Sequence, residues 1–180
     1  RDIHLGKENS TFICGLNDHN SPSHQLHDSK SESIAQARAG GAPVNLKKYR
    51  LALACTGEWG SRTDLGGGTV ASGLDKMVES VNLLNSIYER DFGAHLDLVA
   101  TNERIIYTNI ASDPYATSIS TTGRSLIPMN TDHLNRVIGF ANYDIGHVFT
   151  SSCTDVGGVA YLESLCNPSR KGGAITCWYT

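Results

Sequence analysis

The sequence is poor in long apolar runs and in clustered positive charge. No apolar run approaches the ~20 residues that a helix needs to cross a bilayer, so we expect no membrane span. The 15 Lys and Arg residues are outnumbered by 18 Asp and Glu, which gives a formal net charge of -3. The basic residues form no stripe, and this argues against a nucleic-acid-binding surface. An initiator methionine and a signal-peptide pattern are also missing at the start, and we expect both ends to be cuts in a longer chain.

Cysteine is the residue type that is most informative about the cellular compartment of the chain. The sequence has five cysteines, an odd number, and three of them lie between positions 153 and 177. In a secreted protein an odd count leaves one thiol free or paired outside the chain, whereas in the cytosol all five would be reduced. The density near the C-terminal end is typical of a disulfide-stapled region, so we expect a secreted, extracellular protein. The glycosylation candidate Asn9 points weakly the same way.

The first part of the chain differs in composition from the rest. Residues 1–45 are polar and rich in Ser, His, Asn and Gly, and such a composition buries too little apolar surface to fold alone. We therefore expect an extended arm or prodomain-like linker over residues 1–45 and one domain over residues 46–180. Three histidines follow Cys14 in the arm, but their spacing matches no usual zinc finger, and we interpret them as solvated side chains.

The first elements of the domain have clear periodicities. Residues 49–55 alternate like a strand that is covered on both faces. A loop with five glycines at 57–68 has no Lys-Ser or Lys-Thr pair after it, which argues against a phosphate cradle. The apolar residues of 70–88 recur at steps of three and four, which predicts a helix of about five turns that ends at Gly93.

The middle of the domain has weaker patterns. Residues 95–100 and 104–108 predict either a hairpin or one bent strand with a bulge. Ser, Thr, Asp and Pro are frequent over 109–130, and we expect a long surface loop there. A short helix then follows, with Thr131 or Asp132 as its N-cap.

Two segments near the C-terminal end carry the most specific pattern. Y-D-I-G-H-V-F at 143–149 and G-G-V-A-Y-L at 157–162 predict two strands separated by a polar loop. The resulting order of elements predicts a mixed α/β sheet layered with helices. Asp144 and His147 would point to opposite faces of a strand. We therefore interpret Asp144 as a hydrogen-bonding residue and His147 as a packed histidine, instead of a catalytic pair.

Four stretches in a fixed order carry a family resemblance, at 49–58, at 81–92, at 141–149, and at 157–166 with 170–173. They resemble the N-terminal subdomain of metzincin catalytic domains, in the adamalysin or reprolysin-like branch. The resemblance covers residues 49–177. It implies an α/β fold with a mixed twisted sheet layered with two helices, preceded by the extended arm.

The resemblance implies a secreted zinc metalloendopeptidase, which hydrolyses peptide bonds in protein substrates. Such enzymes hold zinc with the histidines of H-E-x-x-H-x-x-G-x-x-H, and the Glu activates a zinc-bound water. The sequence contains no H-E-x-x-H. We therefore expect zinc in the complete protein, no zinc ligand or catalytic residue within this chain, and no catalysis by the isolated chain.

The resemblance also implies how a peptide substrate binds. In metzincins an edge strand above the cleft aligns the substrate by adding it as an antiparallel strand. The residues at the matching positions are Gly157, Gly158, Val159, Ala160 and Tyr161. Small side chains suit this task because the peptide approaches backbone to backbone. The alternative is an ordinary edge strand that its glycines protect against aggregation.

The cysteines have several possible roles. Cys14, followed by glycine, resembles the cysteine switch of adamalysin prodomains, in which a thiolate takes the open position on zinc and silences the enzyme. A disulfide or a free thiol is the alternative for Cys14. Cys153, Cys166 and Cys177 are disulfide candidates: pairing the first with the third would bracket the edge strand, but the connectivity stays open. Cys55, on an apolar strand, is most simply a buried thiol.

Two further functions stay open. One is a non-catalytic structural or self-assembling subunit derived from a protease fold. Without the active-site helix, the apolar face of the sheet would be exposed to an extent that a soluble monomer rarely tolerates. We therefore expect the remainder of the same protein, or copies of the chain, to cover the open sheet. The other is an inhibitory prodomain that acts in trans through Cys14.

Overall fold

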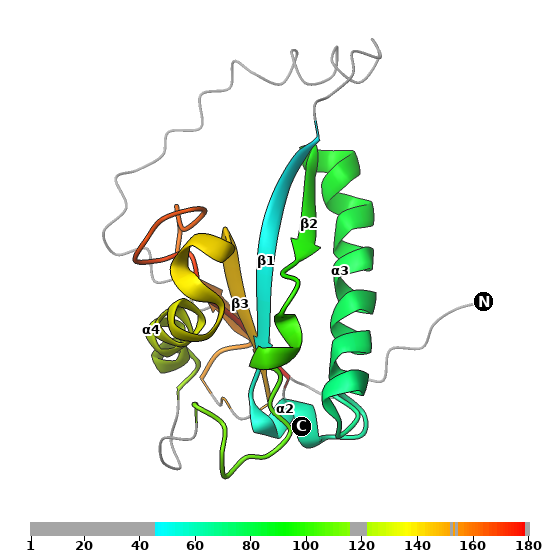
Figure 1. The fold of residues 1–180 in the computed structure, drawn as a ribbon, viewed down its shortest axis with the longest axis vertical. Coiled ribbons are helices and arrows are strands. Elements are labelled where there is room, and N and C mark those ends of the chain that lie inside the picture. The colour runs from blue at the N-terminus through cyan, green and yellow to red at the C-terminus, as the bar shows by residue number, and fades with distance from the viewer. Residues whose placement is uncertain (1–45, 116–121, 152, 154, 179–180) are drawn as a thin grey trace, which may run out of the picture.

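The computed structural model describes residues 46–115, 122–151, 153 and 155–178. Its centre is a five-stranded sheet in the order β2-β1-β3-β5-β4 (Figure 1). The strands are β1 (Lys47–Cys55), β2 (Ala94–Leu98), β3 (Ile145–Thr150), β4 (Gly158–Ala160) and β5 (Ala174–Cys177). Neighbouring strands run parallel, except that β4 runs antiparallel to β5. The predicted mixed α/β fold is confirmed.

The arm expected over residues 1–45 lies outside the described residues. The cysteine-switch candidate Cys14 and the glycosylation candidate Asn9 fall within it. The roles expected for these two residues, and the division of the chain after position 45, stay predictions.

Residues 51–55 of β1 are buried on both faces. Leu51 and Leu53 belong to the apolar cluster formed with α3 (Val70–Phe92), whereas Ala52 and Ala54 belong to the cluster formed with α4 (Gly123–Leu134). This division follows from the period of two, which sends successive side chains to opposite faces. Figure 1 shows the two longer helices on opposite sides of the sheet. The pattern of residues 49–55 therefore predicted correctly a strand that is covered twice.

α3 has caps at both ends. The Thr69 hydroxyl accepts a hydrogen bond from the Ser72 N–H at 3.0 Å, and the Ser72 hydroxyl accepts one from the Thr69 N–H at 3.1 Å. This reciprocal pair is a capping box. At the other end Gly93 adopts φ 62°, a left-handed conformation that glycine tolerates, and the helix stops there as predicted. Met77 and Val81 are buried at 0 % and 4 % exposure, so the apolar stripe packs on the sheet.

α4 shows that the surface loop expected over 109–130 was wrong in its second half. Thr122 caps the helix, and its hydroxyl accepts a hydrogen bond from the Ser125 N–H at 3.3 Å. Thr131 and Asp132, the expected caps, lie within the helix. The Ser, Thr and Pro content of this segment is typical of loops, yet Pro128 lies inside α4, where it leaves one backbone hydrogen bond unmade.

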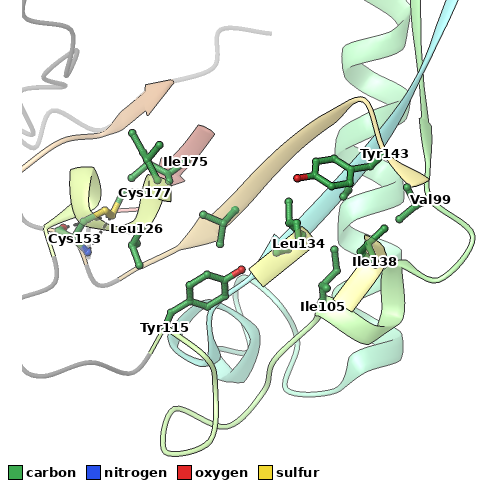
Figure 2. Packing of buried hydrophobic residues seen from close by; sticks show 14 of the residues in the cluster. Val99, Ile105, Tyr115, Leu126, Leu134, Ile138, Tyr143, Cys153, Ile175 and Cys177 are labelled. Carbon is green, nitrogen blue, oxygen red and sulfur yellow. Dashed lines mark hydrogen bonds between the residues drawn. A yellow bond between two sulfur atoms is a disulfide. The ribbon is translucent and has the colours of Figure 1, made fainter. Parts of the chain in front are cut away.

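Packing explains why a polar segment forms a helix here. Asn130 is 0 % exposed, and its amide oxygen accepts a hydrogen bond from the Tyr115 hydroxyl at 2.7 Å. Its amide nitrogen donates to the carbonyl of Gly172 at 2.7 Å. Figure 2 shows Leu126 and Leu134 of the same helix in the apolar cluster, with Tyr115 nearby. After α4 the chain continues through a π turn and a 3-10 turn, Asn135–Gly139 and Phe140–Asn142.

The segment after β2 forms neither a hairpin nor a continuous strand. It turns through a 3-10 helix, Asn102–Ile105, and Ile106 then makes an isolated parallel bridge with Cys55. Where β2 has ended beside β1, the side chain of Asn102 forms the hydrogen bonds that the backbone of a neighbouring strand would form with Leu53. Its Oδ1 accepts from the Leu53 N–H at 2.9 Å, and its Nδ2 donates to the Leu53 carbonyl at 2.9 Å.

Two other elements had no counterpart among the expected ones. The short helix α2, Gly57–Ser61, occupies the start of the glycine-rich segment. β5 lies between β3 and β4 in the sheet, so the strand expected at 157–162 pairs with a strand that follows it in the sequence. Three residues of that segment form β4.

We expect Asn102→Ala to lower the free energy of unfolding by about 2 to 4 kcal/mol, because it leaves a buried donor and a buried acceptor of Leu53 without partners. Urea unfolding followed by far-UV circular dichroism measures the change. Glu103→Ala, at the exposed neighbouring position, is the matched control. Equal stability of the two variants would contradict the role of Asn102 as a substitute for strand backbone.

Candidate functional site

β4 forms one edge of the sheet, and its backbone groups divide between two sides. The Gly157 carbonyl accepts from the Cys177 N–H at 2.8 Å, and the Tyr161 N–H donates to the carbonyl of the residue before β5 at 2.9 Å. Successive residues of an antiparallel strand direct their backbone groups to alternate sides. The N–H and C=O groups of Gly158 and Ala160 therefore face away from β5, and no described strand pairs with them.

The side chains beside this edge are small on one face. Gly158 is paired with Thr176, and Ala160 is paired with Ala174, so these four residues share one face of the two strands. None of their side chains is larger than that of threonine. An extended chain beside β4 meets no bulky β4 or β5 side chain on this face.

The segment that leads into β4 is held at several points. A disulfide joins Cys153 to Cys177 at the end of β5. Asp155 Oδ1 accepts a hydrogen bond from the N–H of Gly123, the first residue of α4, at 2.6 Å. Val156 is 1 % exposed, and a Cβ at Gly123 would lie 2.4 Å from its Cγ2. These contacts fix the start of the edge strand to the core.

The described cysteines fall into three environments. Cys153 and Cys177 form the disulfide that brackets β4, whereas Cys166, the third candidate, is an exposed free thiol. Cys55 is a buried free thiol, and burial raises its pKa to about 12. A thiol that stays protonated is a poor nucleophile, so Cys55 is a packing residue.

Asp144 and His147 do not form a pair. The Asp144 carboxylate accepts from the Arg50 backbone N–H at 2.9 Å, from its Nε at 3.0 Å and from its Nη2 at 2.7 Å. These bonds to Arg50 lower the pKa of Asp144. His147 Nε2 instead lies 2.8 Å from the Thr176 hydroxyl, and burial lowers the pKa of His147 to about 4. Asp144 directly precedes β3 and His147 lies within it, and each residue has the structural contacts expected of it instead of a catalytic partner.

A groove of about 310 Å³ lies between α3 and the sheet. The residues that line it from β3 and α3 are Ile145, His147, Phe149, Ser80, Leu84 and Tyr88. Leu84 and Tyr88 remain 37 % and 36 % exposed, although they belong to the apolar stripe of the helix. The apolar face of the sheet is thus covered at Leu96 of β2 and at Leu51 and Leu53 of β1, which cluster with α3 (Figure 1), and is more open where it continues onto β3.

Lys171 is a buried cation that the sequence patterns did not single out. It is 5 % exposed, and its Nζ donates to the carbonyl of Phe140 and, at 2.8 Å, to the carbonyl of Tyr143. The Nζ also lies 3.9 Å and 4.2 Å from the centroids of the two aromatic rings. Arg50 Nη1 donates to the Ala141 carbonyl at 2.7 Å. The two cations together fix the turn that precedes β3.

A comparison with known protein families shows the family to which the chain belongs. Residues 74–177 match the family model of the reprolysin-like metallo-peptidases, family M12B. The matched region runs from α3 to β5, includes the edge strand β4, and spans more than half of the 180 residues. The chain belongs to this family. The resemblance inferred from the four sequence stretches is confirmed, although no curated protein matches the chain.

M12B peptidases are zinc-dependent in general, so a zinc site is the first metal site to compare with the described residues. Within residues 46–115, 122–151, 153 and 155–178, no group of three or more His, Cys, Asp and Glu side chains is placed to hold a metal ion. The described residues therefore do not fit a zinc site, and we derive no step of zinc chemistry from them. In the same residues, no helix is long and apolar enough for a membrane crossing.

Two histidines make the stability of this M12B chain depend on pH. Burial lowers the pKa of His147 and of His133 to about 4, and Arg136 adds to the effect at His133. In the unfolded chain both titrate near ~6.5. Since the unfolded state binds more protons between these values, we expect stability to be complete above pH ~6.5 and to fall toward pH ~4, by at most ~3 kcal/mol per histidine.

Urea unfolding at about pH 7.5 and about pH 4.5 measures this loss. His147→Gln keeps a hydrogen-bonding group but does not titrate, so its free energy of unfolding should depend less steeply on pH than that of the wild type. His95 is the control with the opposite sign, because its hydrogen bonds to Glu89 and Asp97 raise its pKa. An unchanged pH dependence in His147→Gln would contradict the burial of a neutral imidazole.

Proposed function

We propose that the chain is the substrate-aligning part of a secreted zinc metalloendopeptidase. The observation that carries the proposal is the open edge of β4, within a segment that matches the M12B family. A peptide added antiparallel to β4 would form hydrogen bonds with Gly158 and Ala160, whose backbone groups face outward. Such bonds recognise an extended backbone of almost any sequence, which is what an endopeptidase needs.

The geometry of the edge supports this role. Gly157, Gly158, Val159, Ala160 and Tyr161 are the residues proposed to bind substrate. The small side chains of the strand let a peptide approach to the spacing of a β-sheet, about 4.8 Å. Because the disulfide and the Asp155 contact fix the segment before β4, the edge is ordered before the substrate arrives. Less conformational entropy is then lost on binding.

The proposed extracellular location and zinc chemistry concern the complete protein and not the described residues alone. An extracellular location is supported by the disulfide between Cys153 and Cys177, because such bonds persist in oxidising compartments. The sequence contains no H-E-x-x-H segment, and within the described residues no group of three or more His, Cys, Asp and Glu side chains is placed to hold a metal ion. We therefore propose that the isolated chain aligns peptides but does not cleave them.

The groove beside α3 supports a further element of the proposal. Its wall exposes Leu84 and Tyr88, and an apolar surface of this kind is normally covered. We propose that the remainder of the same protein or another copy of the chain packs there. Coverage by copies would favour the alternative function, a non-catalytic, self-assembling subunit derived from the protease fold.

Ala160→Pro tests the proposed alignment of substrate. The substitution removes one of the two outward N–H groups of β4 but no hydrogen bond to β5, because residue 160 faces away from that strand. We expect the full-length gene product to hydrolyse a quenched fluorescent peptide library with kcat/KM about tenfold lower, the effect of one lost backbone hydrogen bond. Ala160→Ser, which keeps the N–H, should hydrolyse the library like the wild type.

Three results would count against the peptidase proposal. Wild-type kcat/KM in Ala160→Pro would show that β4 is not the substrate edge. Hydrolysis that is unaffected by a zinc chelator would contradict the zinc chemistry. A gene product without zinc and without an H-E-x-x-H segment would favour the non-catalytic subunit.

Sedimentation velocity of the 180-residue chain tests the coverage of the groove. We expect species heavier than the 19.4 kDa monomer as concentration rises, because the apolar wall of the groove is exposed. Leu84→Glu places a charge on that wall and should restore the monomer. Leu83→Glu, which is on α3 but not among the residues that line the groove, is the control. A wild type that stays monomeric at all concentrations would contradict coverage by copies of the chain.

A further inference from the structure

The second edge of the sheet, at β2, is closed by one side chain. Among the described strands β2 pairs only with β1: the Val99 N–H donates to the Leu51 carbonyl at 3.0 Å, and the Gly93 carbonyl accepts from the Lys47 N–H at 2.9 Å. Since backbone groups alternate along a strand, Leu96 faces away from β1. Its N–H and C=O would lie unpaired at the edge if nothing reached them.

Asn85 of α3 supplies both partners. Its Oδ1 accepts from the Leu96 N–H at 2.8 Å, and its Nδ2 donates to the Leu96 carbonyl at 2.9 Å. These are the two bonds that a residue of a neighbouring strand would form. Asn102 makes the same pair of bonds with Leu53, where β1 extends past β2, so the chain uses this device twice.

The position of Asn85 is unusual for an amide. It continues the buried row of α3 formed by Met77 and Val81 at steps of four, where an apolar side chain would fit the pattern. Asn85 is 7 % exposed, and a buried amide is costly unless it is hydrogen-bonded. Its two bonds to Leu96 therefore account for its presence in this row.

The helix alone does not close this edge. A hollow of about 180 Å³ lies against it, lined by Asn82, Asn85, His95 and Asp97 among others. Room for an incoming chain therefore exists beside β2, and the amide of Asn85 is what occupies the backbone groups of Leu96. The polar side chains of His95 and Asp97 add protection of the kind that edge strands commonly carry.

We infer that Asn85 seals the β2 edge, so that the sheet accepts an added strand, whether an extended peptide or the edge of another copy, at β4 alone. The inference that β4 is the receiving edge rests on the proposed function, whereas the seal at β2 stands on the contacts of Asn85. An unpaired edge strand permits both the binding of a substrate and unwanted pairing with other chains. The seal prevents such pairing at β2 and leaves β4 available for a substrate.

Amide hydrogen exchange of the wild-type chain tests the seal directly. The Leu96 amide should exchange at least about tenfold more slowly than those of Ala94 and Leu98, which share its outward direction but have no bond to Asn85. Equal exchange at the three positions would overturn the inference, and this result does not depend on the folding of any variant.

Substitution of Asn85 tests the consequence. Asn85→Ala and Asn85→Leu remove the amide, and the second also fits the apolar row of α3. We expect both to associate more than the wild type with rising concentration in sedimentation velocity, and Ser86→Ala, at an exposed position on the same helix that does not line the hollow, to behave as the wild type. Near-UV circular dichroism verifies the fold. A folded Asn85→Leu chain that associates no more than the wild type would overturn the inference.

The double variant Asn85→Leu with Ala160→Pro identifies the edge that associates. Association in excess of the wild type that persists in the double variant runs through β2 and supports the seal. Excess association that Ala160→Pro abolishes runs through β4 and overturns it. Peptide hydrolysis that Ala160→Pro leaves unchanged would instead contradict the proposed function, without affecting the exchange result at Leu96.

Discussion

Hydrogen bonding along both edges of β1 is the constraint on which the rest of the structure depends. Residues 51–55 are buried on both faces, so each of their backbone groups needs a partner within the protein. β3 supplies the partners on one side. On the other side β2 ends too early, and Asn102 and then Ile106 complete the row. The turn after β2 exists because this row has to be completed.

The two outer edges of the sheet have opposite properties, and this difference matters more for function than the core does. At β2 the backbone of Leu96 is occupied by Asn85. At β4 the outward backbone groups have no partner strand in the described part of the chain, although the strand is held by a disulfide and by the first turn of α4. An unpaired edge strand that is held in place is a liability, because it can pair with other chains and cause aggregation. Retaining one on a three-residue strand is reasonable if a ligand uses it.

Local patterns predicted the elements in which the spacing of apolar side chains itself indicates which faces are buried. The alternation of residues 49–55 and the stripe that ends at Gly93 are of this kind, and the sheet and α3 follow from them. The errors share another cause. Asn130 and Asn102 are polar, and only their distant partners, Tyr115 and Leu53, make them core residues. β5 was missed because its four residues lie in a segment whose cysteines and glycines suggested a loop.

The candidate site was predictable to a similar extent. The segment 157–161 follows from the family resemblance, but which of its residues face outward depends on the register with β5, a strand that the sequence did not predict. The Asp155 contact that holds the edge and the Lys171 contact that holds the turn before β3 likewise join segments far apart in the chain. These contacts are consistent with the proposed division of tasks. In that proposal the described residues supply an ordered edge for an extended peptide, and the neutral His147 in the apolar groove favours a packing partner over a charged ligand at that face.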